Sequence, residues 1–189
     1  MTITPTAIPD VLILKPRVCE DPRGYFIETY STQRYCDAGI ANAFVQDNES
    51  CSMKGVLRGL HYQEPPCAQA KLVRVIRGAV LDVAVDIRRS SPTFGKYVTA
   101  QHSAENKRHL FIPHGFAHGF LVLEDNTIFS YKCDNYYAPQ HECGIRWDDP
   151  TINISWPQLD IPFVLSEKDK QQPFLADAVL FENEKETMR

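Results

Sequence analysis

The chain has 189 residues, of which 43% are hydrophobic and 23% are charged, and its formal net charge is −4. This length and composition are typical of one globular domain with its own core, so we expect a single domain over residues 1–189. No basic block stands out and no apolar run approaches the roughly 20 residues that span a bilayer, which argues against nucleic acid and membranes as partners. The N-terminus also lacks a secretory signal, so a cytoplasmic protein is expected.

Short runs with strand character recur along the chain, with prolines and glycines between them. Residues 1–10 show no periodic pattern of hydrophobic residues. The sequence leaves open whether they form an extended arm that closes the fold or crosses to a partner. Strands are expected over residues 24–29, 44–52, 56–62, 70–76, 79–88, 97–101, 108–112, 117–123 and 127–133. This series of short strands separated by turn residues favours an all-β jelly-roll barrel of the cupin type.

The run at 79–88 is the clearest strand, because apolar residues alternate along it with polar or small ones such as Asp82. A period of two places one set inside and the other outside, or in a polar cavity. The end of the chain differs. Ser166 is a candidate N-cap for a short helix, and residues 176–185 are expected to add a further helical stretch, so we predict a helical tail over 166–189.

Six cysteines are present without a CxxC pair, so neither a zinc ribbon nor disulfides are expected in a cytoplasmic protein. We interpret at least four of them as small packing residues, and Cys67, in a polar stretch, as the best candidate for an exposed thiol.

Polar residues interrupt two of the expected strands. Arg58 and His61 would lie on opposite faces under strict alternation, but Gly59 between them can host a β-bulge that re-aims a side chain. Lys71 shares a strand face with Val73. These residues could be an ordinary surface arginine, a structural histidine and a solvated lysine. If Lys71 instead faces a barrel interior, it is a fixed positive charge suited to stabilising an anion.

His114 and His118 have the i, i+4 spacing of a zinc-binding helix, but Pro113 and the nearby glycines argue against a helix. On a strand that begins at Phe116, His118 lies between aromatic residues, where it could contact a sugar or phosphate or be a core histidine. The HxH motif of metal-binding cupins is absent from the sequence, so we expect no catalytic metal.

Tyr131 lies in line with core residues of its expected strand, where a phenol is either structural or a proton donor. Asp169 could order a histidine ring by accepting a hydrogen bond from one ring nitrogen, which raises the basicity of the other. Asp82, on the polar face of its strand, could do the same.

Eight motifs then indicate a family. In chain order they are DPRGYF (21–26), QDNES (46–50), GVLRGLHY (55–62), PHGFAHGF (113–120), YKCDNYY (131–137), PQHE (139–142), IRWDD (145–149) and LSEKD (165–169). Together they resemble the dTDP-4-dehydrorhamnose 3,5-epimerase family, over about residues 9–173. The resemblance implies a cupin-like jelly roll, a homodimer, no cofactor, and an isomerase acting on dTDP-4-dehydro-6-deoxy-D-glucose in dTDP-L-rhamnose biosynthesis.

The resemblance also implies roles for individual residues. His61 would be the base, Asp169 its partner and Tyr131 the acid, while Lys71 would steady an enolate. Contacts to the nucleotide sugar are implied for Arg23, Phe26, Glu28, Gln46, Asp47, Asn48, Arg58, His118, Glu142 and Lys168. The first three of these would reach the ligand near the dimer interface.

Other functions remain open at this point. A relative that inverts only C3 or C5 would share the same residues, and so would an enzyme acting on another nucleotide sugar. A non-catalytic sugar-nucleotide binding module would not need His61, Lys71 and Tyr131 together, and a metal-dependent cupin oxygenase would need the missing ligand pattern.

Overall fold

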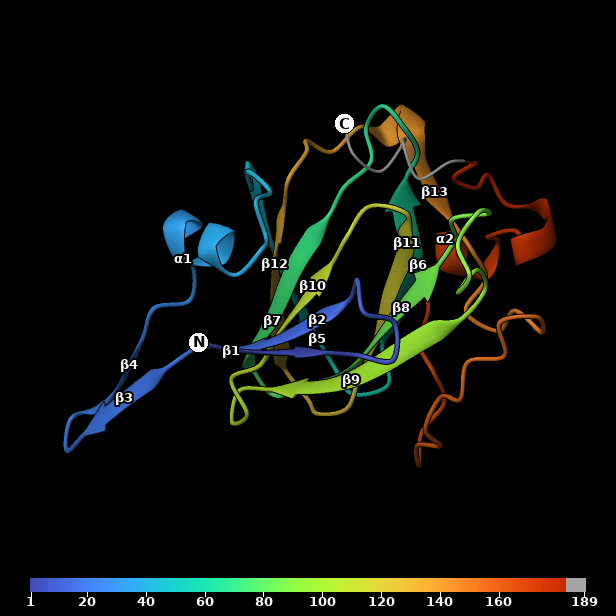
Figure 1. Cartoon of the computed structure of the whole chain (residues 1–189). Helices are drawn as coiled ribbons and strands as arrows, with labels where there is room; N and C mark the ends of the chain where they lie inside the picture. The colour runs from blue at the N-terminus through green and yellow to red at the C-terminus, as the bar shows by residue number, and fades with distance from the viewer. Residues whose placement is uncertain (183–189) are drawn as a thin grey trace.

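Two antiparallel sheets face each other in the computed structural model, which describes residues 1–182 (Figure 1). The first sheet runs, in spatial order, β1 (Thr2–Pro5), β2 (Leu12–Lys15), β10 (His109–Ile112), β7 (Lys71–Arg77), β12 (Thr127–Cys133) and β5 (Gln46–Ser52). The second runs β13 (Glu142–Gly144), β6 (Leu57–Gln63), β11 (Phe116–Val122), β8 (Ala79–Asp86) and β9 (Tyr97–Ser103). Neighbours in each sheet are mostly distant in sequence, which is the jelly-roll arrangement, so the predicted fold class is confirmed.

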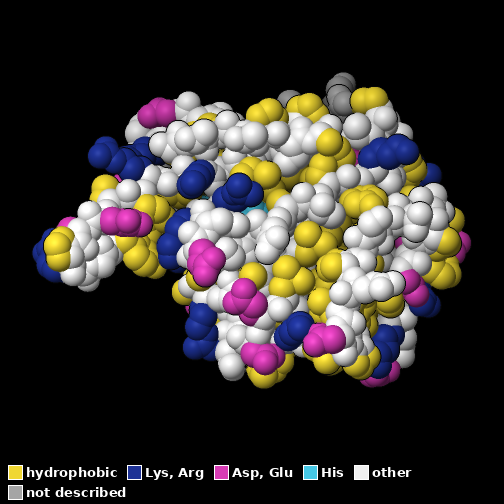
Figure 2. All heavy atoms as spheres, turned by 90° about the horizontal axis from the view of Figure 1, so that it is seen from below, with side chains coloured by type: hydrophobic (Ala, Val, Ile, Leu, Met, Phe, Trp, Pro, Cys, Tyr) yellow, Lys and Arg dark blue, Asp and Glu magenta, His cyan; other side chains and the backbone are white. Residues whose placement is uncertain are grey.

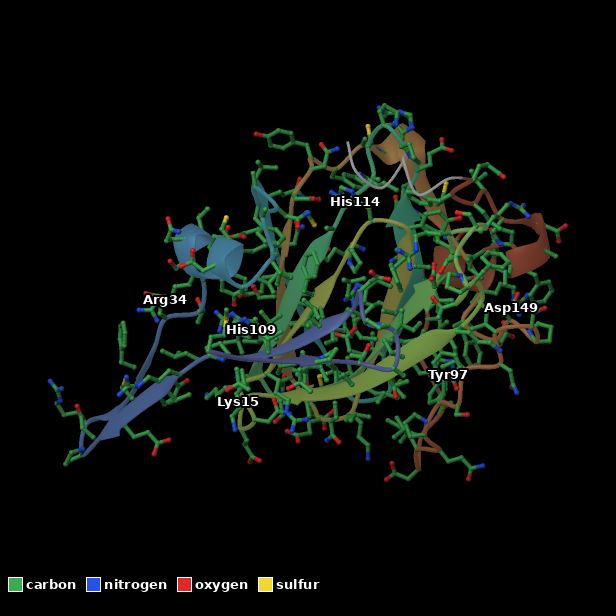
Figure 3. The ribbon with its side chains drawn as sticks, in the orientation of Figure 1. Lys15, Arg34, Tyr97, His109, His114 and Asp149 are labelled. Atoms are coloured by element: carbon green, nitrogen blue, oxygen red, sulfur yellow. The ribbon has the colours of Figure 1, made fainter. Side chains whose placement is uncertain are left out.

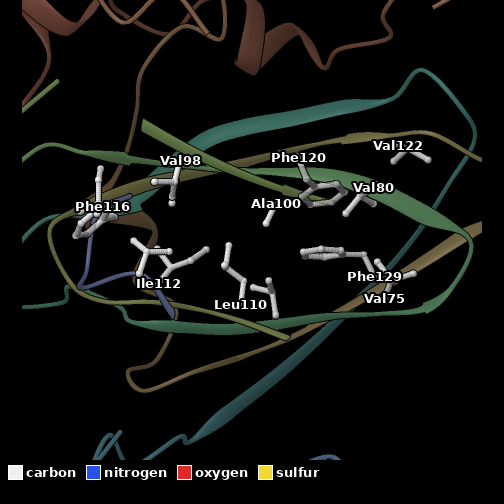
Figure 4. Packing of buried hydrophobic residues seen from close by; sticks show 14 residues of the cluster. Val75, Val80, Val98, Ala100, Leu110, Ile112, Phe116, Phe120, Val122 and Phe129 are labelled. Atoms are coloured by element: carbon white, nitrogen blue, oxygen red, sulfur yellow. The ribbon is translucent and has the colours of Figure 1, made fainter. Parts of the chain in front are cut away.

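The barrel interior is apolar along most of its length. Phe120 of β11 and Phe129 of β12 stack across it with ring centroids 4.0 Å apart, among valines and leucines from both sheets (Figure 4). A second apolar cluster covers the outer face of β8 beneath the C-terminal segment. Because β8 is central in its sheet and covered on both faces, both of its residue sets are buried, apart from the half-buried Leu81. An outward solvated face is therefore absent from this strand.

The N-terminal residues form a strand that sequence periodicity does not reveal. β1 pairs with β2 from Thr2 opposite Lys15 to Pro5 opposite Leu12, and so extends the edge of the first sheet. Also unpredicted were β2, β3 (Val18–Asp21), β13 and helix α1 (Thr32–Asp37). These elements are only three to six residues long, which is too short to show a clear hydrophobic period.

The C-terminal tail is only partly helical. Helix α2 (Glu167–Lys170) begins as predicted, with Ser166 Oγ accepting a hydrogen bond from the Asp169 backbone N–H. The predicted helical stretch at 176–185 is wrong within the described residues. After the short 3-10 turn η2 (Leu175–Asp177), the chain is extended and Phe181 bridges to Arg88, because its ring is buried against the second sheet. Another 3-10 turn, η1 (Pro139–His141), lies earlier in the chain, before β13. Residues 183–185 lie outside the described part.

The thiol predictions were wrong. Cys67 is half-buried, whereas Cys19, Cys36 and Cys51 are exposed, so at most three cysteines pack inside. The exposed three lie on the β3–β4 hairpin, on α1 and on the edge strand β5, which are the parts of the fold that the sheets do not cover. Within the described range, no helix is long or apolar enough to cross a membrane.

A bulge at Gly59 re-aims β6, as predicted. The pairing of β6 with β11 shifts register between His118 and Phe120, and Gly59 has a φ of +123°. A Cβ at this position would lie 2.5 Å from the Cα of Gly119, so both the backbone conformation and the space require glycine. Arg58 and His61 owe their final directions to this irregularity.

Gly59→Ala is therefore expected to lower the free energy of unfolding by about 2 kcal/mol or more, because the methyl group meets backbone atoms that cannot move away. Urea unfolding of the variant measures this. Gly39→Ala is the matched control, since it also has a positive φ of 86° but open space around its Cβ. Equal losses for the two variants would show that close packing at Gly59 contributes nothing.

Candidate active site

A pocket opens between the two sheets at one end of the barrel. Its volume is about 300 Å³, and it is lined by Gln46, Asn48, His61, Tyr62, Gln63, Gln69, Lys71, Tyr131, Tyr137 and Glu142. A second hollow of about 290 Å³ shares Asn48, His61, Lys71 and Tyr131 with it, and adds Arg58, His118 and residues of β5. The two hollows meet at the residues predicted to be catalytic.

His61 is held by a buried carboxylate. Its Nε2 lies 2.5 Å from Oδ1 of Asp169, which α2 presents to β6. Burial raises the pKa of Asp169, but hydrogen bonds from His61, Ser166 and the Gly59 backbone outweigh this and leave it below its ordinary value. The ionised carboxylate accepts the hydrogen on Nε2, so the lone pair of a neutral His61 is on Nδ1, where it can act as a base.

Lys71 provides a positive charge in the interior. Its side chain is 9% exposed, and its Nζ lies 3.4 Å from the backbone oxygen of His61. Burial lowers the pKa of Lys71 from its ordinary value. An ammonium in this position is poorly solvated and gains most when an anion forms beside it.

Tyr131 shares both hollows with His61. In β12 it lies opposite Asn48 of β5 and Val73 of β7, and its ring is 6.1 Å from that of Phe129. Burial raises the pKa of Tyr131, so the phenol keeps its hydrogen at neutral pH. A protonated phenol and an imidazole on different strands of one cavity can form an acid–base pair.

His118 is held by a different carboxylate. Its Nε2 lies 2.7 Å from Oδ1 of Asp82, and both side chains are buried. Burial lowers the pKa of His118, although the charge of Asp82 opposes this. The ring lies beside those of Phe120 and Phe129, at centroid distances of 6.2 and 6.1 Å. Asp82 thus orders His118, whereas Asp169 orders His61.

The outer wall of the pocket is polar and tightly connected. Glu142 bonds to Lys168 at 2.5 Å and to the Tyr137 hydroxyl at 2.6 Å, while the Tyr137 backbone N–H donates to Gln46 at 2.9 Å. Gln46 in turn donates to Asn48 at 3.1 Å. Tyr137 was missed as a site residue, although the YKCDNYY motif contains it and could have indicated it.

Of two further predicted ligand contacts, Arg58 lies in the site and Asp47 does not. Arg58 lines the second hollow and donates to Ser52 Oγ at 3.1 Å. Asp47 is not brought to either hollow, because alternation along β5 turns it away from Gln46 and Asn48, and it pairs with Lys132 at 2.8 Å instead.

The hairpin residues also lie apart from the pocket within a single chain. β3 and β4 (Gly24–Ile27) project from the barrel, as Figures 1 and 2 show. Phe26 is 71% exposed, Arg23 bonds to Asp21, and Glu28 pairs at 3.1 Å with Arg34 on α1 (Figure 3). One chain therefore does not bring these three predicted ligand contacts to the site.

Comparison with known proteins agrees with this geometry. The sequence profile of dTDP-4-dehydrorhamnose 3,5-epimerase matches residues 5–177. The chain belongs to this family. The dTDP-4-dehydrorhamnose 3,5-epimerase of Shigella flexneri is 54% identical over 96% of the chain and 99% of its own length.

Solved structures of epimerases have the same fold. A Legionella pneumophila dTDP-6-deoxy-D-glucose-3,5-epimerase, in complex with dTDP-4-keto-L-rhamnose, is 46% identical with a TM-score of 0.93 over 97% of this chain and 98% of its own. A 3'-monoepimerase from Streptomyces bikiniensis, in complex with dTDP-quinovose, is 36% identical with a TM-score of 0.85 over 91% of this chain and 87% of its own. The chain is thus structurally similar both to a 3,5-epimerase and to a 3'-monoepimerase.

Proposed function

We propose that the chain inverts C3 and C5 of dTDP-4-dehydro-6-deoxy-D-glucose to give dTDP-4-dehydro-L-rhamnose, the epimerisation in dTDP-L-rhamnose biosynthesis. The observation that carries the proposal is that His61, backed by Asp169, and Tyr131 line one cavity beside the buried ammonium of Lys71. Membership of the family and the high identity to named 3,5-epimerases support the substrate.

The chemistry follows from the ketone at C4 of the sugar, which acidifies the hydrogens on C3 and C5. His61 Nδ1 takes one of them, and the electron pair moves to the C4 oxygen as an enolate. Lys71 stabilises that oxygen, because a fixed charge in a poorly hydrated site needs no reorganisation. Tyr131 then donates its hydrogen to the carbon from the opposite face of the ring, which inverts the centre.

The polar wall suits the nucleotide part of the substrate. Glu142, Lys168, Gln46 and Asn48 present both acceptors and donors, which a base and its deoxyribose need. Arg58 in the second hollow supplies a guanidinium, the side chain best matched to a diphosphate.

The direct test is incubation with dTDP-4-dehydro-6-deoxy-D-glucose in D₂O, followed by proton NMR of the product. We expect deuterium at both C3 and C5 and the L-rhamno configuration. A product with neither exchange nor inversion would refute the proposal.

A single-centre epimerase is the second candidate, favoured by the structural similarity to the Streptomyces bikiniensis 3'-monoepimerase. The same experiment separates the two, because deuterium and inversion at one carbon alone would select this alternative.

Tyr131→Phe is expected to keep deuterium exchange while lowering the rate of inversion by about 10²-fold or more, because His61 still removes the hydrogen but no acid returns one from the other face. Quantifying exchange into recovered substrate against product formation measures the difference. Tyr136→Phe, which changes an exposed neighbouring phenol, is the control. Normal inversion by the Tyr131 variant would place the acid elsewhere.

A homodimer of single-domain chains over residues 1–189 is part of the proposal. The β3–β4 hairpin supports it, since Tyr25 and Phe26 are exposed on a projecting element that a second copy could cover. Through the hairpin, Arg23, Phe26 and Glu28 would reach the partner's ligand. Light scattering on the intact chain tests this. Cytoplasmic location is also proposed, because all six cysteines are free thiols, as is usual in a reducing compartment.

A further inference from the structure

A second set of buried polar side chains lies next to His118, inside the barrel. Asp82 of β8 and His102 of β9 are both fully buried. In the register of these strands, Val80 lies opposite His102 and Asp82 opposite Ala100. Val80 and Ala100 belong to the interior cluster (Figure 4), so Asp82 and His102 face the interior too, as diagonal neighbours about 7–8 Å apart at their Cα atoms.

In each of these two side chains, only one of the two polar atoms has a hydrogen-bond partner among the described residues. Asp82 Oδ1 accepts from His118 at 2.7 Å, and His102 Nδ1 lies 3.3 Å from the backbone oxygen of Arg108. Asp82 Oδ2 and His102 Nε2 are buried and have no hydrogen-bond partner among the described residues. Because buried polar atoms are almost always hydrogen-bonded, two such atoms on neighbouring side chains point to a shared partner.

The chemistry of His102 defines that partner. A backbone oxygen can only accept, so Nδ1 carries the ring hydrogen. Burial lowers the pKa of His102, so the ring is neutral at neutral pH and Nε2 carries a lone pair. A lone pair and a carboxylate oxygen are both acceptors and cannot bond to each other. A water molecule between them would donate one hydrogen to each, and two polar partners are the minimum that a buried water needs.

We propose that His102 is a positioning residue for His118. Through one buried water shared with Oδ2, it fixes the Asp82 carboxylate, which in turn holds the His118 ring with its hydrogen on Nε2. The Nδ1 of His118 is then left as an acceptor towards the second hollow, where a sugar hydroxyl can donate to it. This last consequence rests on the proposed function, whereas the positioning itself does not.

Two substitutions test the roles of the two His102 ring nitrogens separately. In His102→Asn, the amide N–H takes the place of Nδ1 and keeps a donor for Arg108, but nothing reaches towards Asp82. In His102→Gln, the longer amide places a polar group near the position of Nε2. Nitrogen-15 NMR of the imidazole rings in the ligand-free protein reports the His118 tautomer, and steady-state kinetics report kcat and KM.

We expect His118 to be in the Nε2–H form in the native protein and in a mixture of tautomers in His102→Asn. In that variant kcat should fall by about 3- to 10-fold, the equivalent of one hydrogen bond, while KM changes by less than about 2-fold. His102→Gln should restore both the tautomer and most of kcat. His109→Asn is the control, because His109 is equally buried but bonds to Tyr35 at 3.0 Å, and it should leave the His118 signals unchanged.

An unchanged His118 tautomer in His102→Asn would overturn the proposal, as would an equal change in His109→Asn. A crystal structure that resolves internal waters should show one bonded to both Asp82 Oδ2 and His102 Nε2, and none there would equally overturn it. If the native protein fails to turn over the dTDP-sugar, the proposed function fails but the NMR result still stands, so the two failures are distinguishable.

Discussion

Deuterium incorporation at both C3 and C5 is expected to disappear in His61→Ala, with kcat lowered by about 10²- to 10⁴-fold. In the proposed mechanism one imidazole, held by Asp169 at 2.5 Å, is the base for both carbons. Asp169→Asn should have a smaller effect of the same kind, because a neutral amide holds the ring but no longer stabilises its protonated form. The measurement is proton NMR of the recovered nucleotide sugar after incubation in D₂O.

Binding provides the control for this result. Calorimetry with dTDP should show nearly native affinity for His61→Ala, since the polar wall around Glu142 and Lys168 is unchanged. Exchange at a near-native rate in a variant that still binds dTDP would show that His61 is not the base. Loss at one carbon alone would mean that a second group serves the other.

Lys71→Met is expected to lower kcat by about 10²- to 10³-fold while leaving the protein as stable as before or more stable. The two effects have one cause. The ammonium is 9% exposed and its pKa is lowered by burial, so it costs folding free energy in the absence of an anion. An apolar chain of similar length removes that cost, by about 1–3 kcal/mol, and removes the stabilisation of the enolate with it.

Thermal unfolding and steady-state kinetics on the same preparation test whether kcat falls while stability is kept or increased. Lys132→Met is the matched control, because Lys132 is on the neighbouring strand and bonds to the exposed Asp47, where an ion pair contributes little. Its kcat should stay native. A Lys71→Met variant that loses both stability and activity would show that the lysine has a structural role.

Several features of the site could be predicted because they depend on local pattern. The run around Arg58, Gly59 and His61 combines strand residues with a glycine that can host a bulge, and the bulge is present. Ser166 was predicted as a cap, and the helix that it begins carries Asp169 to His61. Alternation in β12 predicted that Tyr131 faces the same side as Phe129, which it does.

Other features depend on contacts between distant segments. Asp82 was a candidate partner for either histidine, and only the packing of β8 beside β11 assigns it to His118. Tyr137 joins the site through its bonds to Gln46 and Glu142, which a pattern within one strand cannot show. Asp47 was predicted from the resemblance, although alternation on its own strand turns it outward.

The sequence by itself determined the strand series and the family, and it predicted the acid–base residues, because side-chain period, turn residues and ordered motifs are local properties of the chain. The tertiary structure alone decided which carboxylate orders which histidine, that both faces of β8 are buried, and that His102 lies beside Asp82 in the interior. The physical reason is that burial and pairing of a charged group depend on every segment packed around it, and those segments are far apart along the chain.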